Sequence, residues 1–275
     1  MPRIKQGWIA VGAMIGVELV GGPTLGENSA GLLGEGRRVY LANCAMCHGE
    51  NGDGKGQGAA QLRVKPRDLR TGSFKFRSTP SGSLPQDDDL EKTLIRGVRG
   101  TGMVPQRHLG RDERRAVIAY IKAFSERFVK EQPQAPVTVP PPSPPTPDVI
   151  AGGRRIYRKA QCAECHGEGG RGDGPSAPTM KDDRGLPIVV PDFTRWPLKR
   201  RAEPEDLYRT IATGLNGTPM PSYSDALDPE EIWALVRYLD SLAPPERRQP
   251  LDRIFPGEET IGQKIEEEAR RTPVH

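Results

Sequence analysis

Apolar residues recur at helical spacing in several short stretches of the chain, which predicts a mainly helical protein. One helix is expected to begin at the acidic run 87–89 and to end at Gly97, because acids favour the positive end of a helix and glycine favours its C-terminus. Another is expected to begin near Asp112. A further helix should follow Asp228 and Pro229, since aspartate caps helices and proline is accommodated in the first turn. The apolar positions that support these helices are Leu90, Leu94, Ile95, Val117, Ile118, Ile121, Phe124, Ile232, Leu235, Val236 and Leu239.

Most of the chain consists of one pattern that occurs twice. Residues 36–40 (GRRVY) recur as residues 153–157 (GRRIY), at an offset of 117 positions. Later parts of the pattern recur at an offset of 117 or 118, including a Gly-Thr-x-Met segment that ends at Met103 in the first copy and at Met220 in the second. Self-similarity of this kind predicts that one fold occurs twice.

The two copies are joined by residues 131–147, a segment that contains eight prolines. Such a composition favours polyproline II, which acts as a semi-rigid spacer. We therefore expect a first domain over residues 31–130, this proline-rich linker, a second domain over 148–245 and a charged tail over 246–275.

Each copy carries the motif Cys-x-x-Cys-His, and the two motifs use every cysteine in the chain. Two thiols three positions apart on one helical turn can add to two vinyl groups of one porphyrin, and the adjacent histidine can then ligate its iron. The motifs therefore predict two covalently attached haem c groups. The residues involved are Cys44, Cys47, His48, Cys162, Cys165 and His166.

A zinc site and a redox dithiol are the alternatives for such motifs. The two cysteine pairs of a four-cysteine zinc site usually lie ~15–20 residues apart. Cys44 and Cys162 are 118 positions apart, and each pair carries its own histidine. A thioredoxin-like dithiol follows a strand and opens a helix, whereas a glycine-rich loop follows His48. Haem attachment is therefore the preferred interpretation.

The composition agrees with a bound porphyrin. Only 35% of residues are hydrophobic and 5% aromatic, which is little for two ordinary cores. A covalent haem is itself a large apolar body around which a short chain can pack. The 28 prolines and 32 glycines predict much loop.

The sixth ligand of each iron can be predicted from position. An iron that carries electrons needs two fixed axial ligands, and thioether sulfur favours the ferrous state. Met103 lies 55 residues after His48, and Met220 lies 54 residues after His166. We predict that both methionines are sixth ligands. His108 is a rival to Met103, so bis-histidine ligation in the first domain remains an alternative.

Haem propionates are anionic and need cations or hydrogen-bond donors. The candidates are Arg77 and Thr79 in the first copy, and Trp196 and Arg200 in the second. The alternative for these residues is a solvated basic loop.

These residues together resemble the class I c-type cytochromes, in a tandem diheme form, over about residues 34–128 and 150–243. The resemblance implies an all-α fold with His/Met-ligated iron. It also implies that the first and last helices of each domain cross with a glycine against an aromatic side chain. Residues 65–80 look like part of the diheme cytochromes that attach to respiratory complexes. The residues that match the helix crossing are Gly36, Tyr120, Gly153 and Tyr238.

Residues 1–30 resemble a targeting segment. Arg3 and Lys5 precede an apolar run that starts at Trp8, as in the first two regions of a signal peptide. The run is shorter than the ~20 apolar residues of a membrane span, but an uncleaved N-terminal anchor remains an alternative. Since bacterial c-type haem is generally attached outside the cytoplasm, the resemblance implies a periplasmic protein or one on the outer face of the cytoplasmic membrane.

The two domains differ in charge. Residues 31–130 contain 19 Lys and Arg against 11 Asp and Glu, whereas residues 148–245 contain 13 against 15. A basic first domain favours docking to an acidic redox partner, because opposite charge speeds encounter. The sequence contains no nucleic-acid-binding motif, which argues against nucleic acid as the partner.

The function that these observations favour is a relay that carries electrons between redox partners of a respiratory chain, with membership of a membrane complex left open. The alternatives are a diheme enzyme, such as a peroxidase or a sulfur-compound oxidoreductase, and a gas sensor. Both need an iron with an open position, whereas each iron here has a candidate methionine. We therefore expect an electron carrier and not an enzyme.

Overall fold

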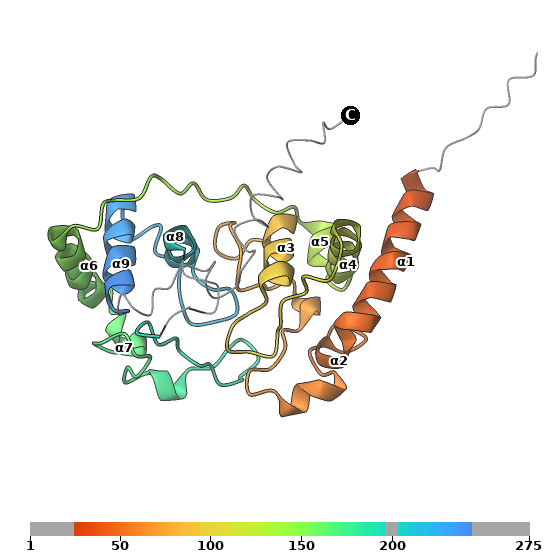
Figure 1. The fold of residues 1–275 in the computed structure, drawn as a ribbon, viewed down its shortest axis with the longest axis horizontal. Helices are drawn as coiled ribbons and strands as arrows, with labels where there is room; N and C mark the ends of the chain where they lie inside the picture. Colours follow the sequence, from red (N-terminus) through yellow and green to blue (C-terminus); the bar gives the residue numbers. More distant parts are fainter. Residues whose placement is uncertain (1–24, 196–197, 199–202, 244–275) are drawn as a thin grey trace, which may run out of the picture.

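A computed structural model describes residues 25–195, 198 and 203–243. Within these residues the chain forms helices and no β-strand, with one isolated bridge between Lys181 and Pro187. The all-α prediction is confirmed. The helices form two domains that lie side by side, α1 to α5 in the first and α6 to α9 in the second (Figure 1).

The first domain contains α1 (Leu25–Asn43), α2 (Ala45–His48), η1 (Gln57–Gln61), η2 (Leu69–Thr71), α3 (Asp87–Arg96), α4 (Arg111–Ala123) and α5 (Arg127–Lys130). The second domain contains α6 (Pro147–Lys159), α7 (Ala163–His166), η3 (Ala177–Thr179), α8 (Pro204–Thr213) and α9 (Pro229–Ser241). The elements labelled η are short 3-10 helices.

Local capping explains where the predicted helices begin. Helix α3 starts at the acidic run and stops before Gly97, whose φ of 64° suits glycine. The carboxylate of Asp228 accepts a hydrogen bond from the amide of Glu231 at 2.8 Å and so caps α9. At α4 the amide of Gly110 donates to the carboxylate of Glu113 at 2.9 Å. These helix starts lie within one residue of the predicted positions.

The first helix is longer than predicted. It was expected to begin near Gly36, but α1 begins at Leu25. No proline occurs between Pro23 and the end of α1, so nothing stops the helix from extending toward the N-terminus despite its glycines. The boundary predicted at residue 30 between a targeting segment and the first domain therefore falls inside a helix.

In each domain the first and last helices cross at very short distance. A β-carbon on Gly36 would overlap the carbonyl oxygen of Ala116 in α4 and would lie 2.8 Å from the β-carbon of Tyr120. Gly153 in α6 meets the carbonyl oxygen of Ala234 in α9 in the same way. Only glycine permits so close an approach. The residues that the resemblance implied, Gly36, Tyr120, Gly153 and Tyr238, form the expected crossings.

Each domain has its own hydrophobic core, and a buried tyrosine ties that core to the loop after the Cys-x-x-Cys-His motif. The hydroxyl of Tyr40 donates to the carbonyl of Gly49 at 2.7 Å, and the hydroxyl of Tyr157 donates to the carbonyl of Gly167 at 2.7 Å. Both tyrosines are almost completely buried. The two loops are therefore fixed to the first helix of their domain.

The proline-rich linker lies along both domains. Residues 131–146 contain no helix and cross from one domain to the other (Figure 1). The amide of Val137 donates to the carbonyl of Ser78 in the first domain at 2.8 Å. From the second domain, the indole N–H of Trp233 donates to the carbonyl of Pro140 at 3.1 Å. The linker is thus attached to the surface of both domains.

Residues 1–24 and the predicted tail at 246–275 lie outside the described residues, as do Trp196 and Arg200. In the part of the chain that the structure describes, we find no helix with the length and apolar character of a membrane span.

Candidate haem-binding site

The two Cys-x-x-Cys-His motifs form the same short helical turn. Helix α2 carries Cys47 and His48, with Cys44 at the residue before it. Helix α7 carries Cys165 and His166 in the same arrangement. Each motif therefore gathers two thiols and one imidazole on a single turn, as covalent haem attachment requires.

The ring of His48 is oriented by a main-chain carbonyl. Its Nδ1 lies 3.1 Å from the carbonyl oxygen of Arg67, which makes Nδ1 the protonated nitrogen and leaves Nε2 for iron. Burial lowers the pKa of His48, the carbonyl of Arg67 opposes this shift, and the positive charge of Arg184 adds to it. A lowered pKa favours the neutral imidazole, which is the form that binds a metal.

The ring of His166 is oriented differently. Burial lowers its pKa to about 4, and the carbonyl of Pro191 opposes this shift. Its Nδ1 is buried and forms no hydrogen bond of normal geometry with any described residue. Instead the ring stacks on Phe193, with centroids 4.7 Å apart and planes at 26°. Leu69 occupies the position of Phe193 in the first domain, since both residues donate a main-chain hydrogen bond to the glycine-rich loop at 2.7 Å.

The two predicted methionine ligands lie in loops of the same conformation. The amide of Met103 donates to the hydroxyl of Thr101 at 3.1 Å, and the amide of Met220 donates to the hydroxyl of Thr218 at 3.3 Å. Each methionine carbonyl also accepts a hydrogen bond from the amide five residues earlier, at 2.8 and 3.2 Å. Local hydrogen bonding therefore holds each loop in place.

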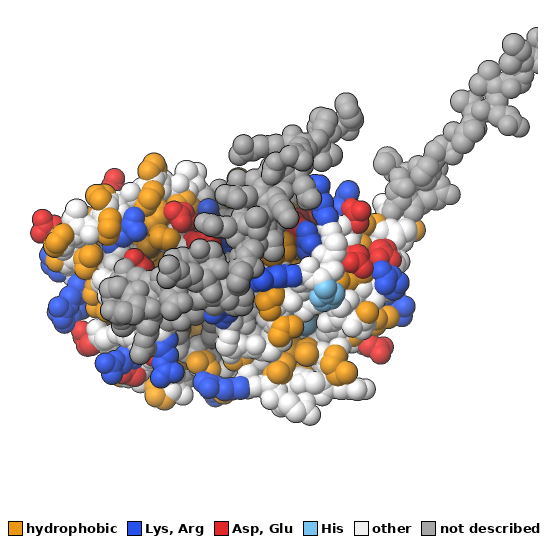
Figure 2. All heavy atoms as spheres, in the orientation of Figure 1, with side chains coloured by type: hydrophobic (Ala, Val, Ile, Leu, Met, Phe, Trp, Pro, Cys, Tyr) orange, Lys and Arg blue, Asp and Glu red, His pale blue; other side chains and the backbone are white. Residues whose placement is uncertain are grey.

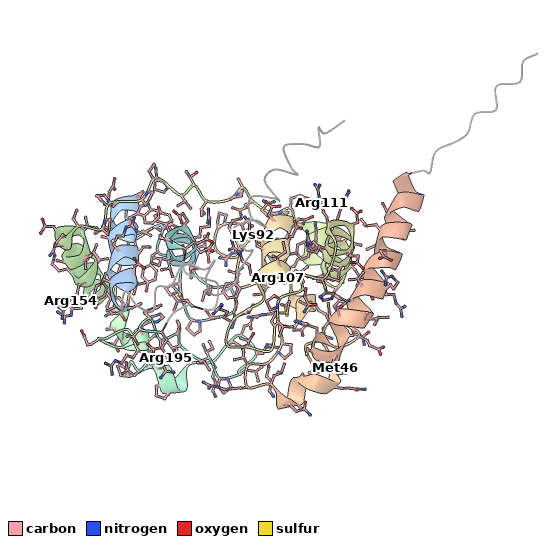
Figure 3. The ribbon with its side chains drawn as sticks, in the orientation of Figure 1. Met46, Lys92, Arg107, Arg111, Arg154 and Arg195 are labelled. Atoms are coloured by element: carbon pink, nitrogen blue, oxygen red, sulfur yellow. The ribbon has the colours of Figure 1, made fainter. Side chains whose placement is uncertain are left out.

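Met103 and His108, the two candidates for the sixth ligand of the first iron, have different surroundings in the structure. The side chain of His108 is exposed, and its Nε2 lies 2.8 Å from the side-chain oxygen of Asn43. Met103 packs against the core of the first domain and lines its cavity. The side chain of Met46, between the first two cysteines, is 62% exposed and points away from the fold (Figure 3).

A single cavity of about 740 Å³ extends across both domains. Its wall includes apolar side chains from each domain, such as Leu94 and Ile211. Because one cavity reaches both motifs, the two haem sites open onto a shared space at the domain boundary. All the predicted site residues line it: Cys44, Cys47, His48, Met103, Cys162, Cys165, His166 and Met220.

The residues present fit a covalently bound haem. Each half of the cavity supplies paired thiols, a neutral imidazole and a thioether sulfur among apolar side chains, which is the donor set of a low-spin c-type haem. Two buried polar atoms in the cavity wall, Nδ1 of His166 and Nε of Arg184, form no hydrogen bond of normal geometry with the described residues. Such an N–H of arginine suits an anionic acceptor.

Arg77 and Thr79 do not line this cavity. The guanidinium of Arg77 is fully buried and donates to the carbonyl of Thr213 at 2.7 Å, at the C-terminal end of α8. A cation at this end of a helix is favourable because carbonyl groups there carry partial negative charge. The hydroxyl of Thr79 donates to the carbonyl of Leu84 at 2.8 Å. The structure therefore gives Arg77 a role in joining the domains and Thr79 a role within a loop.

Other polar contacts also join the two domains. Arg96 in α3 pairs with the carboxylate of Asp206 in α8 at 3.0 Å, and Asp206 is almost completely buried. The amide of Gly82 donates to the side chain of Asn216 at 3.0 Å. Hydrogen bonds and ion pairs therefore help to join the two domains.

Sequence reasoning missed how the histidines are held. Neither the carbonyl of Arg67 nor the ring of Phe193 was predicted. One signal was available: the chain takes 17 positions from Gly52 to Leu69 but 23 positions from Gly170 to Phe193. The additional six residues belong to a loop that reaches the other domain.

Two helical domains, each with a crossing at a glycine and a Cys-x-x-Cys-His turn that opens into an apolar cavity, define a c-type cytochrome. The family model for cytochrome c matches residues 33–125, and the model for subunit III of cbb3-type cytochrome c oxidase matches residues 148–239. The chain belongs to the class I c-type cytochromes, in tandem form, and carries two covalently bound haem c groups.

The chain is similar to proteins of known complexes. The cbb3-type oxidase subunit FixP of Sinorhizobium medicae is 32% identical over 34% of this chain and 30% of that subunit. The subunit CcoP of Azospirillum sp. is 26% identical over 75% of this chain and 61% of that subunit, so the chain spans less than two thirds of either relative. A solved chain from a reducing HAO-like protein complex of Kuenenia stuttgartiensis is 44% identical, with a TM-score of 0.75 over 76% of this chain and 96% of that chain.

Proposed function

We propose that this diheme cytochrome relays electrons as a subunit of a larger redox complex. In the proposal, His48 and Met103 ligate one iron, and His166 and Met220 ligate the other. The observation that supports it is the single cavity, which the ligands of both irons line. Two haem sites that open onto one shared cavity suit transfer from one iron to the other.

The protein's own contribution to this transfer is to keep the ligands still. The bound haem supplies a one-electron ferric–ferrous couple. The carbonyl of Arg67 and the ring of Phe193 orient the two histidines, and main-chain hydrogen bonds hold the backbone of the two loops that carry the methionines. Rigid ligands favour electron transfer because little has to rearrange when the charge on iron changes. They also argue against an enzyme, which needs an open iron.

We propose that the partner is an HAO-like protein. The support is the 44% identity to a chain of a complex with that name, nearly all of which this chain covers. The cbb3-type relatives support a respiratory role more generally. The basic first domain, with 19 Lys and Arg against 11 Asp and Glu over 31–130, would face an acidic surface of the partner. Lys and Arg side chains lie over both halves of the face in Figure 2, so charge alone does not restrict docking to one end.

The proposed location is the periplasm or the outer face of the cytoplasmic membrane. Its support is the covalent haem, together with the basic and apolar residues at the start of the sequence. Co-purification from the native host, with the partners identified by mass spectrometry, tests location and partner together.

Replacement of the methionines tests the ligands. Met103→Ala should remove thioether ligation from one haem and lower its potential, because sulfur stabilises ferrous iron. Met220→Ala should do the same to the other haem. His108→Ala is the matched control, and it should leave both optical spectra and both potentials unchanged.

Potentiometry with optical detection distinguishes the outcomes. If His108→Ala alters the first haem and Met103→Ala does not, the first iron has two histidine ligands. If one ferrous haem of the wild-type protein readily binds carbon monoxide, that iron is open and an enzyme becomes the better interpretation.

A further inference from the structure

We propose that a turn of the second domain positions the proximal ligand of the first haem and that Arg184 in this turn sets the potential of that haem. We call residues 181–187 the cross-domain turn. The inference rests on the proposed ligation of the first iron by His48. It adds a role for side chains outside both Cys-x-x-Cys-His motifs.

The cross-domain turn is built to hold its shape. An isolated bridge pairs Lys181 with Pro187 at its base. Within it, the carboxylate of Asp182 accepts hydrogen bonds from the amides of Arg184 and Leu186, both at 3.0 Å. The amide of Asp182 also donates to the carbonyl of Leu186 at 2.8 Å. The turn therefore presents Arg184 from a fixed backbone.

Two contacts from this turn hold one peptide of the first domain. The guanidinium of Arg184 donates to the carbonyl of Pro66 at 2.9 Å. The next residue, Arg67, pairs through its side chain with Asp183 at 3.3 Å. The carbonyl of this same Arg67 faces Nδ1 of His48. The carbonyl that orients the first histidine is thus held in place by the other domain.

The guanidinium also lies against the loop that follows the first motif. The amide of Gly54 donates to the carbonyl of His48 at 2.8 Å. A β-carbon on Gly54 would lie 2.7 Å from the carbonyl oxygen of Pro66 and 3.2 Å from Nη1 of Arg184. Gly54 has φ of 76°, so glycine is favoured here for its backbone as well as for space. The positive charge is therefore packed beside the backbone of His48.

The arrangement in the second domain differs among the described residues. His166 stacks on Phe193, and its Nδ1 forms no hydrogen bond of normal geometry, although the carbonyl of Pro191 acts on its pKa. The guanidinium of Arg184 contacts the carbonyl of Pro66, on the side of the first haem. A change at Arg184 should therefore act mainly on the first haem. Asp183 differs, because its amide donates to the carbonyl of Gly217 at 3.1 Å, in the loop that carries Met220. A change at Asp183 can act on both haems.

The sign of each effect follows from charge. Reduction removes one positive charge from the iron, so a nearby cation favours the ferrous state and a nearby anion opposes it. Arg184→Gln should lower the reduction potential of the first haem. We expect the ferric–ferrous equilibrium constant to change at least threefold, which corresponds to about 30 mV for one electron. Asp183→Asn should raise the potential. Arg184→Lys should restore most of the wild-type value because it retains the charge.

The experiment is potentiometric titration of the holoprotein, with haem content and circular dichroism as measures of folding. Arg154→Gln is the matched control, since it removes the same charge from an exposed position on α6, away from the cavity (Figure 3). It should leave both potentials unchanged. Met220→Ala identifies the second potential, so that the first can be assigned.

Opposite shifts for Arg184→Gln and Asp183→Asn support the inference. Unchanged potentials, or shifts of the same sign, overturn it, because general loosening of the boundary would not distinguish the two charges. Should Arg184→Gln fail to fold, Arg184→Lys and Asp183→Asn still carry the test. A wild-type protein with only one haem, or without thioether ligation, would instead overturn the proposed function.

Discussion

Alanine at Gly153 should separate two helices that now touch. A β-carbon there would overlap the carbonyl oxygen of Ala234 and lie 2.8 Å from the β-carbon of Tyr238. Carbon atoms prefer a separation of about 3.5–4.0 Å, so α6 and α9 would have to move apart by roughly 1 Å. Overpacking of this kind costs about 1–3 kcal/mol of the free energy of unfolding.

The neighbouring Gly152 provides a matched control. Its β-carbon would meet only the guanidinium of Arg155, at 3.7 Å, which is an ordinary contact. Both substitutions gain the higher helix propensity of alanine, about 0.8–1.0 kcal/mol. The difference in the free energy of unfolding between the two variants therefore reports the effect of the helix crossing alone. We expect Gly153→Ala to be less stable than Gly152→Ala by about 1–3 kcal/mol.

Thermal and denaturant unfolding of the two holoproteins, followed by circular dichroism, measures this difference. For a chain of this size each kcal/mol corresponds to about 2–4 °C in Tm. Gly152→Ala should be at least as stable as the wild type. Equal stability of the two variants would refute the close crossing of α6 and α9 as the reason for glycine at position 153.

Two further predictions concern single hydrogen bonds and acid stability. Tyr157→Phe should lower the free energy of unfolding by about 1–3 kcal/mol, because it leaves the buried carbonyl of Gly167 without its donor. Tyr40→Phe should have the same effect in the first domain, where the carbonyl of Gly49 loses its donor. Unchanged midpoints of denaturant unfolding in both variants would contradict this role. The pKa of Asp68 is lowered, chiefly by the hydrogen bond from the side chain of Arg70 and against the effect of burial. Its contribution to stability is therefore present above its ordinary pKa of 3.8 and is lost as the pH falls through the lower pKa of the folded state. Below about pH 4, the free energy of unfolding should fall less steeply with decreasing pH in Asp68→Asn than in the wild type, as measured by denaturant unfolding at a series of pH values. Identical pH profiles would show that the pairing with Arg70 is unimportant.

The parts of the fold that the sequence predicted are those set by local rules. Asp228 and the acidic run 87–89 mark helix starts because capping depends on the side chain and the next few amides. Gly36 and Gly153 were predicted from the resemblance to the class I c-type cytochromes, and they lie eight and nine residues before the first cysteine of their haem motifs. The start of α1 was placed wrongly, since three glycines lie between Leu25 and Gly36 and the helix continues through them.

The parts that it did not predict depend on contacts between the domains. Arg77 was a candidate for a propionate, yet its guanidinium meets the carbonyl of Thr213 in the other domain. The sequence around a basic loop residue does not indicate which hydrogen-bond acceptor its side chain will contact in the fold. The cross-domain turn is similar, because no periodicity of its residues indicates that Arg184 will lie against Pro66. The available signal was the length of the loop from Gly170 to Phe193, which is six residues longer than its counterpart in the first copy.

The linker determines how well the polar contacts between the domains can hold them together. Contacts such as the ion pair of Arg96 and the hydrogen bond of Arg184 would hold two separate chains together only weakly, because the groups lose their hydration when the contact forms and the net gain in free energy is small. A short tether makes the encounter intramolecular, with an effective concentration on the order of millimolar. The spacing between the two haems is then independent of how dilute the protein is. A single cut within residues 131–146 would make that spacing depend on concentration.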